Sequence, residues 1–340
     1  MIYTYIVLIL LEELETMELA KTANTDVLRH FSVVEDSLPI LDIESLIPYF
    51  LGDLDVSEST KQTYTRVLHI FNRHLQEQDI SSPTLADIIE YKDKLMMEGK
   101  KSHTVQNYLI GIKQFFKWTS DPDNRIYPNV ARKIKNVKIK NKGHYKDYLK
   151  KDKVLEVVKQ FNRDTVKGKR DYAMFVLMVT TGARSIEVSR MDIQDITTKA
   201  GQLVILIQGK GETEKARPIK VSKTAYEAIN DYLNAKASYL PHEPLFTSLS
   251  NNSAGKRLST RSIRGAMKNA FRQAGIDNDR ITCHSLRHTF ATQNLLNGGT
   301  FEETKEAMGH SSIVVTQRYA HNYQWELNYS ESRVDAALFN

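Results

Sequence analysis

Residues 132 to 153 form a basic run that has few apolar side chains to offer to a core. Ten lysines and arginines lie in this run, and only Asp147 and Asp152 oppose them. Because the flanking segments are much more apolar, each must bury its own hydrophobic surface. A chain of 340 residues is long enough for two such domains. We therefore predict an interdomain linker at residues 131–152.

The first domain, predicted at residues 39–130, has the apolar spacing of packed helices. Apolar side chains recur at helical intervals from Tyr64 to Leu75 and again from Val105 to Phe116. Thr84 and Asp87 form a capping pair at the start of a helix between these two segments. The pattern predicts a compact helical unit.

The charge distribution indicates what kind of partner the chain could bind. Its formal net charge is +6, but residues 1–38 hold seven acidic and two basic residues, a net charge of −5, so the rest carries +11. A basic body suits a polyanionic partner, although a solvated surface would have the same composition. Residues 1–38 are predicted to be an acidic extension of unknown role, and Met17 is an alternative start.

Several classes of protein are disfavoured. The apolar stretch at residues 2–11 is too short to span a bilayer, which needs roughly 20 residues, and it lacks the basic start of a signal peptide. The single cysteine, Cys283, excludes an intrachain disulfide framework and a cysteine-cluster metal site. A cytoplasmic location fits these features.

The second domain, predicted at residues 153–321, mixes helices with a small β-hairpin. An apolar helix over residues 171–179 leads to the turn at Gly182. Two apolar segments of strand length, 203–207 and 218–221, flank a tip rich in glycine and charge. Further helices are expected near residues 222–236, 260–274, 284–296 and 301–308. The predicted fold class is mainly α with a small β-sheet.

The helix at 260–274 has a cationic stripe roughly 120° around the helix from its apolar face. Helical pitch places its four basic residues on one side, namely Arg261, Arg264, Lys268 and Arg272. Such a stripe is most often a solvated face. The residues that follow it along the chain favour contact with DNA.

Five polar residues make a chemically coherent set: Arg184, His284, Arg287, His310 and Tyr319. Arginine binds phosphate oxygens through a planar fork, imidazole transfers protons, and a phenol can attack phosphorus. Each residue alone has an ordinary explanation as a capping, surface or packing residue. A capping box at Thr300 and the helix stop at Gly309 place His310 beside a helix end.

The motifs around these residues resemble those of the tyrosine recombinases, the phage integrase and Xer family. The resemblance covers about residues 40–325 and is strong over 170–321. It is carried by Thr181-Gly182-Ala183-Arg184 with Glu187 and Asp195, by Gly209-Lys210-Gly211, by Cys283-His284-Ser285-Leu286-Arg287-His288-Thr289-Phe290-Ala291-Thr292, and by Met308-Gly309-His310-Ser311-Ser312-Ile313.

The resemblance implies a role for each residue. Tyr319 would attack a scissile DNA phosphodiester and form a 3′-phosphotyrosyl link. Arg184 and Arg287 would bind the non-bridging oxygens, and Lys210 would protonate the leaving 5′-oxygen. His284 would act in proton transfer at the tyrosine, while His310 would bind or position the phosphate.

Physical chemistry supports this reaction without metal, ATP or another cofactor. A phenol, with a pKa near 10, needs a base or a cationic pocket to react at neutral pH. His284 and His288 are four residues apart, but an intervening arginine and the lack of an acidic third ligand argue against zinc. Lys215 and Lys220 remain alternatives to Lys210. Tyr323 and Tyr329 remain alternatives to Tyr319.

The resemblance also implies an architecture and an assembly. The two domains would form a C-shaped clamp on double-stranded DNA, and four copies would act on two duplexes. The linker cations are predicted to lie along phosphates, although a flexible linker is the simpler interpretation; they include Arg132, Lys133, Lys135, Lys138 and Lys140. The tail, residues 322–340, would dock on a neighbouring protomer or pack as an ordinary terminal helix.

The predicted function is therefore that of a site-specific DNA recombinase. A non-catalytic DNA-binding regulator on the same scaffold and a type IB topoisomerase are the alternatives, and a metal-dependent nuclease is more distant. The target sequence remains open, as do the choice among integration, excision and resolution, and the need for a partner recombinase or a DNA-bending protein.

Overall fold

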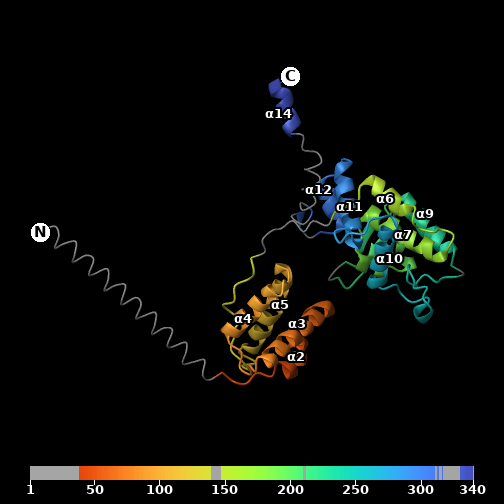
Figure 1. Cartoon of the computed structure of the whole chain (residues 1–340). Coiled ribbons are helices and arrows are strands. Elements are labelled where there is room, and N and C mark those ends of the chain that lie inside the picture. The colour runs from red at the N-terminus through yellow and green to blue at the C-terminus, as the bar shows by residue number, and fades with distance from the viewer. Residues whose placement is uncertain are drawn as a thin grey trace. The chain divides into compact units, whose positions relative to one another are not determined.

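The computed structural model describes residues 38–138, 147–209, 212–236, 238–310, 312–313, 316 and 330–339 (Figure 1). The chain divides into two compact units, one before residue 143 and one from residue 143 onward. Each unit has a hydrophobic core of its own. The elements of each unit are described separately below.

The first unit is a bundle of helices. It contains α2 (Ile43–Gly52), α3 (Glu58–Glu77), α4 (Leu85–Met97) and α5 (Ser102–Thr119). In the bundle α3 packs against α2 and α5, and α4 packs against α5 (Figure 1). Four fully buried aromatic rings fill the centre, namely Phe50, Phe71, Phe115 and Phe116. Large aromatic side chains supply much of the apolar area that a small helical unit can bury.

Local signals set the helix ends in this unit. Thr84 and Asp87 form the predicted capping box, because the Thr84 hydroxyl accepts from the Asp87 amide and the Asp87 carboxylate accepts from the Thr84 amide. Packing continues beyond α5 into the basic run: Ile134 is buried in this core, and Val137 donates its amide to Gln106 Oε1 at 3.0 Å. Apolar residues of the basic run thus pack into the core of the first unit, although the composition of the run predicted that it would contribute little to a core.

The second unit is built around α7 (Val166–Thr181), which is buried on nearly all sides. Helices α9 (Lys223–Asn234), α10 (Thr260–Gln273) and α11 (Cys283–Leu296) pack on it. Three shorter helices complete the unit: α6 (Lys151–Val158), α8 (Ser185–Arg190) and α12 (Phe301–Met308). Short 3₁₀ turns lie at Ile193–Asp195 and Asn251–Ser253, and α14 (Ser330–Phe339) lies near the C-terminus. The start of α7 is earlier than predicted, because Thr165 caps the helix through the Gly168 amide.

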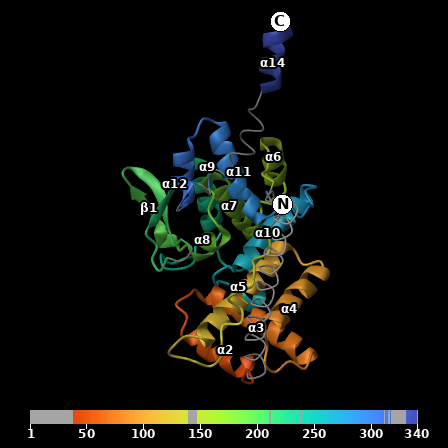
Figure 2. The same ribbon diagram turned by 90° about the vertical axis from the view of Figure 1, so that its left-hand side faces the viewer.

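A small antiparallel sheet lies at one edge of the second unit (Figure 2). Its strands are β1 (Ile196–Lys199), β2 (Gln202–Ile207) and β3 (Arg217–Lys220), in the order β1-β2-β3. Ile205 lies opposite Ile196 and Ile219, so the predicted hairpin of β2 and β3 is confirmed. The sequence did not indicate β1, because three of its four residues are exposed and polar.

The observed architecture confirms a mainly helical fold with a small sheet and two domains. Within the described parts of the chain, no helix is long and apolar enough to cross a membrane.

Candidate active site

Arg184 is positioned by the junction between α7 and α8. The α7 helix ends at Gly182, whose φ of 68° is a left-handed conformation that favours glycine. A Cβ at Gly182 would also lie 2.8 Å from the ring of Phe290 on α11, so both the turn and the close packing require glycine. Arg184 follows as the N-cap residue of α8.

Glu187 fixes the Arg184 side chain. Its carboxylate is fully buried, with 0% of the side chain exposed, and accepts hydrogen bonds from the Arg184 amide at 2.7 Å and from Arg184 Nη1 at 2.8 Å. A buried carboxylate is stable only when cations or other donors satisfy it. The pair therefore holds one edge of a guanidinium that is still 28% exposed and accessible to a ligand.

Arg287, on α11, is almost completely buried, with 2% of the residue exposed. Its Nη1 donates to the Gly182 carbonyl at 2.7 Å, and its Nη2 donates to the Met308 carbonyl at 2.8 Å. The first carbonyl precedes Arg184 by two residues, and the second precedes His310 by two. One guanidinium thus joins the two chain segments that carry the other candidates.

His310 lies directly after the C-terminal end of α12. The predicted capping box of Thr300 and Glu303 is present at the start of this helix, and Gly309 ends it with a φ of 61°. The imidazole is 9% exposed, and its Nδ1 is 2.9 Å from the Thr316 hydroxyl oxygen.

The surroundings of His310 keep its ring neutral. Burial, together with the positive charges of Arg287, Arg184 and Arg217 and the neighbouring His284, lowers its pKa to about 4. A neutral imidazole at pH 7 can hold or release a proton at one nitrogen while the arginines supply fixed positive charge.

Arg217, on β3, belongs to the same cluster, although the sequence did not single it out. Its Nη2 donates to Glu187 Oε1 at 3.2 Å, and its Nη1 donates to the Ala307 carbonyl at 3.1 Å. No local pattern marks this residue, which is one basic residue among several at the base of the hairpin. The cluster therefore holds three arginines around one buried carboxylate and one neutral histidine.

His284 is exposed at the start of α11. Its ring lies edge-on to His288, with 5.0 Å between the ring centroids. Among the residues that the structure describes, no group of three or more His, Cys, Asp or Glu side chains is arranged to hold a metal ion.

The two remaining catalytic candidates, Lys210 and Tyr319, lie outside the described residues, as do Tyr323 and Tyr329. Gly209, the residue directly before Lys210, is held by two hydrogen bonds. The Gly209 amide donates to Glu212 Oε2 at 2.8 Å, and the Gly209 carbonyl accepts from Arg190 Nη1 at 3.3 Å. A Cβ on Gly209 would lie 2.6 Å from the Glu212 carboxylate, so a larger residue there would displace the Glu212 side chain.

Lys215, an alternative to Lys210, forms ion pairs with two aspartates. Its Nζ donates to Asp192 Oδ2 and to Asp195 Oδ2, both at 2.5 Å. Burial raises the pKa of Asp192, but hydrogen bonds from Lys215 and Arg257 outweigh it and hold that pKa below its ordinary value. Lys220, the other alternative, is exposed and pairs with Val204 near the start of β2, away from the hairpin tip.

The cations predicted to contact DNA have different surroundings. In the first unit Arg132, Lys133, Lys135 and Lys138 are exposed, and Lys140 lies outside the described residues. On α10 Arg261 is exposed, and Arg264 Nε donates to the Ser185 hydroxyl, beside Arg184, at 3.3 Å.

The far end of the α10 stripe is paired with an acid. Lys268 Nζ lies 3.0 Å and Arg272 Nε 3.3 Å from Asp277 Oδ1. Hydrogen bonds from Lys268 and Arg272 hold the pKa of Asp277 below its ordinary value. The stripe thus has an end beside Arg184 and an end that is partly neutralised.

Cys283, directly before His284, is a packing residue. The thiol is buried, its Sγ lies 3.9 Å from Met178 Sδ, and burial raises its pKa to about 12. A thiol that stays protonated at neutral pH is a poor nucleophile.

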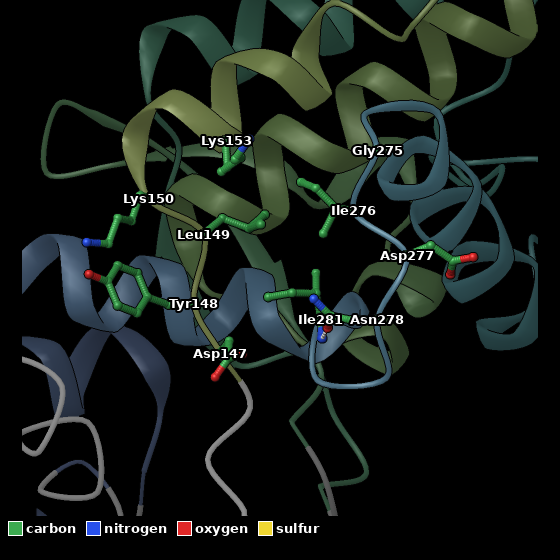
Figure 3. Close-up of a pocket in the computed structure, with 10 residues that line it drawn as sticks. All are labelled: Asp147, Tyr148, Leu149, Lys150, Lys153, Gly275, Ile276, Asp277, Asn278 and Ile281. Atoms are coloured by element: carbon green, nitrogen blue, oxygen red, sulfur yellow. Dashed lines mark hydrogen bonds between the residues drawn. The ribbon is translucent and has the colours of Figure 1, made fainter.

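A pocket of about 400 Å³ opens elsewhere in the second unit, between residues 147–153 and 275–281 (Figure 3). Leu149, Ile276 and Ile281 line it together with Lys150 and Lys153. None of the catalytic candidates that the structure describes lines this pocket. It is therefore separate from the arginine cluster.

The cluster has the chemistry of an oxyanion site. Fixed guanidinium groups stabilise a negatively charged phosphorane without having to reorganise, and they are more effective where water is excluded. The structure brings Arg184, Arg287 and His310 together through Gly182, Glu187 and the end of α12.

Comparison with known proteins identifies the family. Residues 147–326 match the family model described as phage integrase family, and residues 43–121 match the phage integrase N-terminal SAM-like domain. The chain belongs to the phage integrase family. It is a tyrosine recombinase, an enzyme that cleaves and rejoins DNA strands at specific sites.

Two curated relatives illustrate the similarity. Tyrosine recombinase XerD of Listeria monocytogenes is 27% identical over 293 residues, which cover 82% of this chain and 93% of the relative. Tyrosine recombinase XerC of Thermodesulfovibrio yellowstonii is 30% identical over 231 residues, which cover 66% of this chain and 73% of the relative.

Solved structures share the fold. A XerH site-specific recombinase bound to palindromic difH substrate, in a post-cleavage complex, is 20% identical with a TM-score of 0.65; the match covers 80% of this chain and 79% of that one. A lambda integrase tetramer bound to a Holliday junction is 16% identical with a TM-score of 0.63, covering 85% and 80%.

Proposed function

We propose that Tyr319 is the nucleophile of this recombinase. The phenolic oxygen attacks the scissile phosphorus, forming a bond from tyrosine to the 3′-phosphate while the bond to the 5′-oxygen breaks. Lys210 supplies the proton that the departing 5′-oxygen takes up. In the second half of the reaction a 5′-hydroxyl from the partner strand attacks the phosphotyrosine, releases Tyr319 and rejoins the DNA. The bond energy is kept throughout, so the steps require neither ATP nor a metal.

Arg184 and Arg287 stabilise the phosphorane by binding its non-bridging oxygens. The observation that carries this assignment is the shared network in which Arg184, Arg287 and the segment before His310 are fixed to one another by hydrogen bonds. His310 positions the phosphate as a neutral imidazole, and His284, which is exposed beside the cluster, exchanges the proton of Tyr319.

Double-stranded DNA with specific recombination sites is the substrate, which implies a cytoplasmic reaction. The helical domain (39–130), the basic linker (131–152) and the catalytic domain (153–321) all act on the duplex. Exposed cations at Arg132, Lys133, Lys135 and Lys138 support phosphate contacts by the linker.

Four protomers assemble on two duplexes. This assembly requires each subunit to contact its neighbours. Val334, Leu338 and Phe339 on α14 are exposed, which supports docking of the tail, residues 322–340, on a neighbouring protomer. The solved lambda integrase structure is a tetramer bound to a Holliday junction. A partner recombinase or a DNA-bending protein would join this assembly at some sites.

A suicide-substrate assay tests the proposal. The full chain is incubated with nicked duplexes from its genomic neighbourhood in the presence of EDTA, and the products are separated on a denaturing gel. We expect a covalent protein–DNA band that is absent for Tyr319→Phe and persists for Tyr323→Phe and Tyr329→Phe. Cleavage near the nick frees a short fragment that carries the 5′-hydroxyl, and its loss prevents religation, so the covalent product accumulates.

Other results would reject parts of the proposal. A band that survives in Tyr319→Phe would assign the nucleophile to another tyrosine. DNA binding without any covalent band would favour a non-catalytic regulator. Relaxation of supercoils without site preference would favour a topoisomerase, and cleavage abolished by EDTA would favour a metal-dependent nuclease.

A further inference from the structure

Arg217 links two segments that are far apart in the sequence. Its two terminal nitrogens have different acceptors: Nη2 donates to the Glu187 carboxylate on α8, and Nη1 donates to the Ala307 carbonyl at the end of α12. Glu187 in turn holds Arg184, and His310 lies three residues after Ala307. The β3 strand therefore braces both the Arg184 turn and the His310 turn.

The turn before His310 is shaped to admit this arginine. A Cβ built on Gly309 would lie 2.7 Å from both Cζ and Nε of Arg217, closer than real Cβ atoms approach other atoms. Gly309 also has a φ of 61°. The backbone conformation favours glycine at this position, and the missing Cβ leaves room for the guanidinium in its observed place.

Arg217 and Arg287 hold neighbouring carbonyls. Arg217 binds the Ala307 carbonyl, and Arg287 binds the next one, of Met308. The last carbonyls of a helix have no partner within the helix, so they are available to such donors. Two guanidinium groups thus fix the end of α12 from two directions, and the position of His310 depends on both.

The bridge needs the geometry of arginine. Glu187 is fully buried and accepts from both Arg184 and Arg217, which together satisfy its charge. A guanidinium reaches two separate acceptors through a rigid planar fork, whereas an ammonium is a single point of charge on a flexible stem. Lysine at this position would keep the positive charge but lose the bridge.

We propose that Arg217 is a positioning residue of the recombinase, which holds the His310 turn in register with Arg184 through Glu187 and the Ala307 carbonyl. This inference rests on the proposed roles of Arg184 and His310 in phosphate binding. Arg217 acts through its contacts with the protein, and it is not itself assigned to the scissile phosphate.

Arg217→Lys and Arg217→Gln test the inference in the full chain, with Lys199→Gln as the matched control. Lys199 is an exposed cation on β1 of the same sheet. Three quantities are measured: the single-turnover rate of covalent adduct formation on a suicide substrate, the affinity for the same duplex, and the titration of the His310 ring by NMR.

Both Arg217 variants are expected to form the adduct about 100-fold more slowly, because small displacements of a catalytic group cost about that much. Their DNA affinity should stay within about twofold of wild type, because the Arg217 side chain contacts other residues of the protein and is not assigned to a phosphate. The His310 titration should move upward from about 4 in both variants, because the released turn gains water. Lys199→Gln should match wild type in all three measurements.

Two results would overturn the inference. An Arg217→Lys protein with the wild-type adduct rate and His310 titration would mean that only the charge matters. A loss of DNA affinity as large as the loss of rate would make Arg217 a DNA contact. Adduct formation by Tyr319→Phe would reject the proposed nucleophile instead, and the His310 titration, which needs no substrate, would then decide the role of Arg217 alone.

Discussion

Two charged side chains of the arginine cluster are deeply buried in the second unit. Glu187 and Arg287 are nearly inaccessible to water, and each is satisfied by partners from another part of the chain. A buried ion pair contributes little net stability compared with apolar residues of the same volume. A phosphate site, by contrast, needs fixed cations in a dry environment. The cost of burying these charges is therefore consistent with a catalytic role.

The ionisation of His310 leads to a test of this environment. Its pKa is about 4 in the folded chain, whereas an unfolded histidine titrates near 6.5. Between these values the unfolded chain binds more protons, so the free energy of unfolding should fall as pH decreases from about 6.5 to 4. The contribution of His310 alone to this loss of unfolding free energy should approach roughly 3 kcal/mol.

His310→Gln isolates this contribution because glutamine does not titrate. Calorimetric unfolding of both proteins at several pH values should give a constant difference above about pH 7 and a relative loss for wild type at lower pH. Parallel curves over the whole range would contradict a depressed His310 pKa in the folded protein.

The β2–β3 hairpin is anchored on both sides of its tip. Arg190 and Glu212 hold Gly209 before the tip, and Lys215 lies between Asp192 and Asp195 after it. The two anchors fix the residues on either side of the tip. Anchoring of this kind reduces the entropy lost when the loop contacts its substrate.

Lys210→Ala and Lys215→Met distinguish a general acid from a loop anchor. Lys210→Ala should slow cleavage at least about 100-fold, the usual range for a lost general acid. Lys215→Met should have a smaller effect, because it loosens the hairpin and leaves Lys210 in place. Both defects should largely disappear with a 5′-bridging phosphorothiolate, because a thiolate leaves without protonation. A larger defect in Lys215→Met than in Lys210→Ala would make Lys215 the acid.

The basic residues of the chain differ in whether they already have an acidic partner, and therefore in how readily they can contact DNA. On α10 Arg264 lies beside Ser185 and the Arg184 turn, while Lys268 and Arg272 share Asp277. A cation that already has a carboxylate partner releases fewer counterions when it meets a phosphate. The end of the stripe beside Arg184 should therefore contribute more to DNA binding.

Salt dependence of binding tests this difference. Arg264→Gln should weaken binding and reduce the slope of log affinity against log salt by about 1, as expected for one lost phosphate contact. Arg272→Gln removes the same charge from the same helix and should change the slope by less than about half as much. Equal slopes for the two variants would mean that Asp277 does not limit the contacts of its partners.

Much of the fold was predictable because its signals are local. Helices α3, α5 and α10 follow from apolar spacing, the ends of α4 and α12 from capping boxes, and the β2–β3 pair from two apolar segments around a glycine-rich tip. These features depend on interactions between residues close in sequence. The catalytic candidates were found for a different reason: they follow the motifs of a family.

Features that depend on distant partners were not predictable. The β1 strand has one inward residue, Ile196, and forms because β2 offers an edge to pair with. Arg217 has no periodic or motif signal, and its importance appears only when β3 brings it to Glu187 and Ala307.

The amino-acid order was thus sufficient for most of the longer helices, the hairpin and the two-core organisation, because spacing and capping act over a few residues. Its motifs also nominate the set of reactive residues. It did not reveal that Arg287 binds carbonyls beside both Arg184 and His310, that His310 is neutral, or that Arg217 braces their turns. Those properties arise from burial and from hydrogen bonds between segments up to 105 residues apart, and so they exist only in the folded chain.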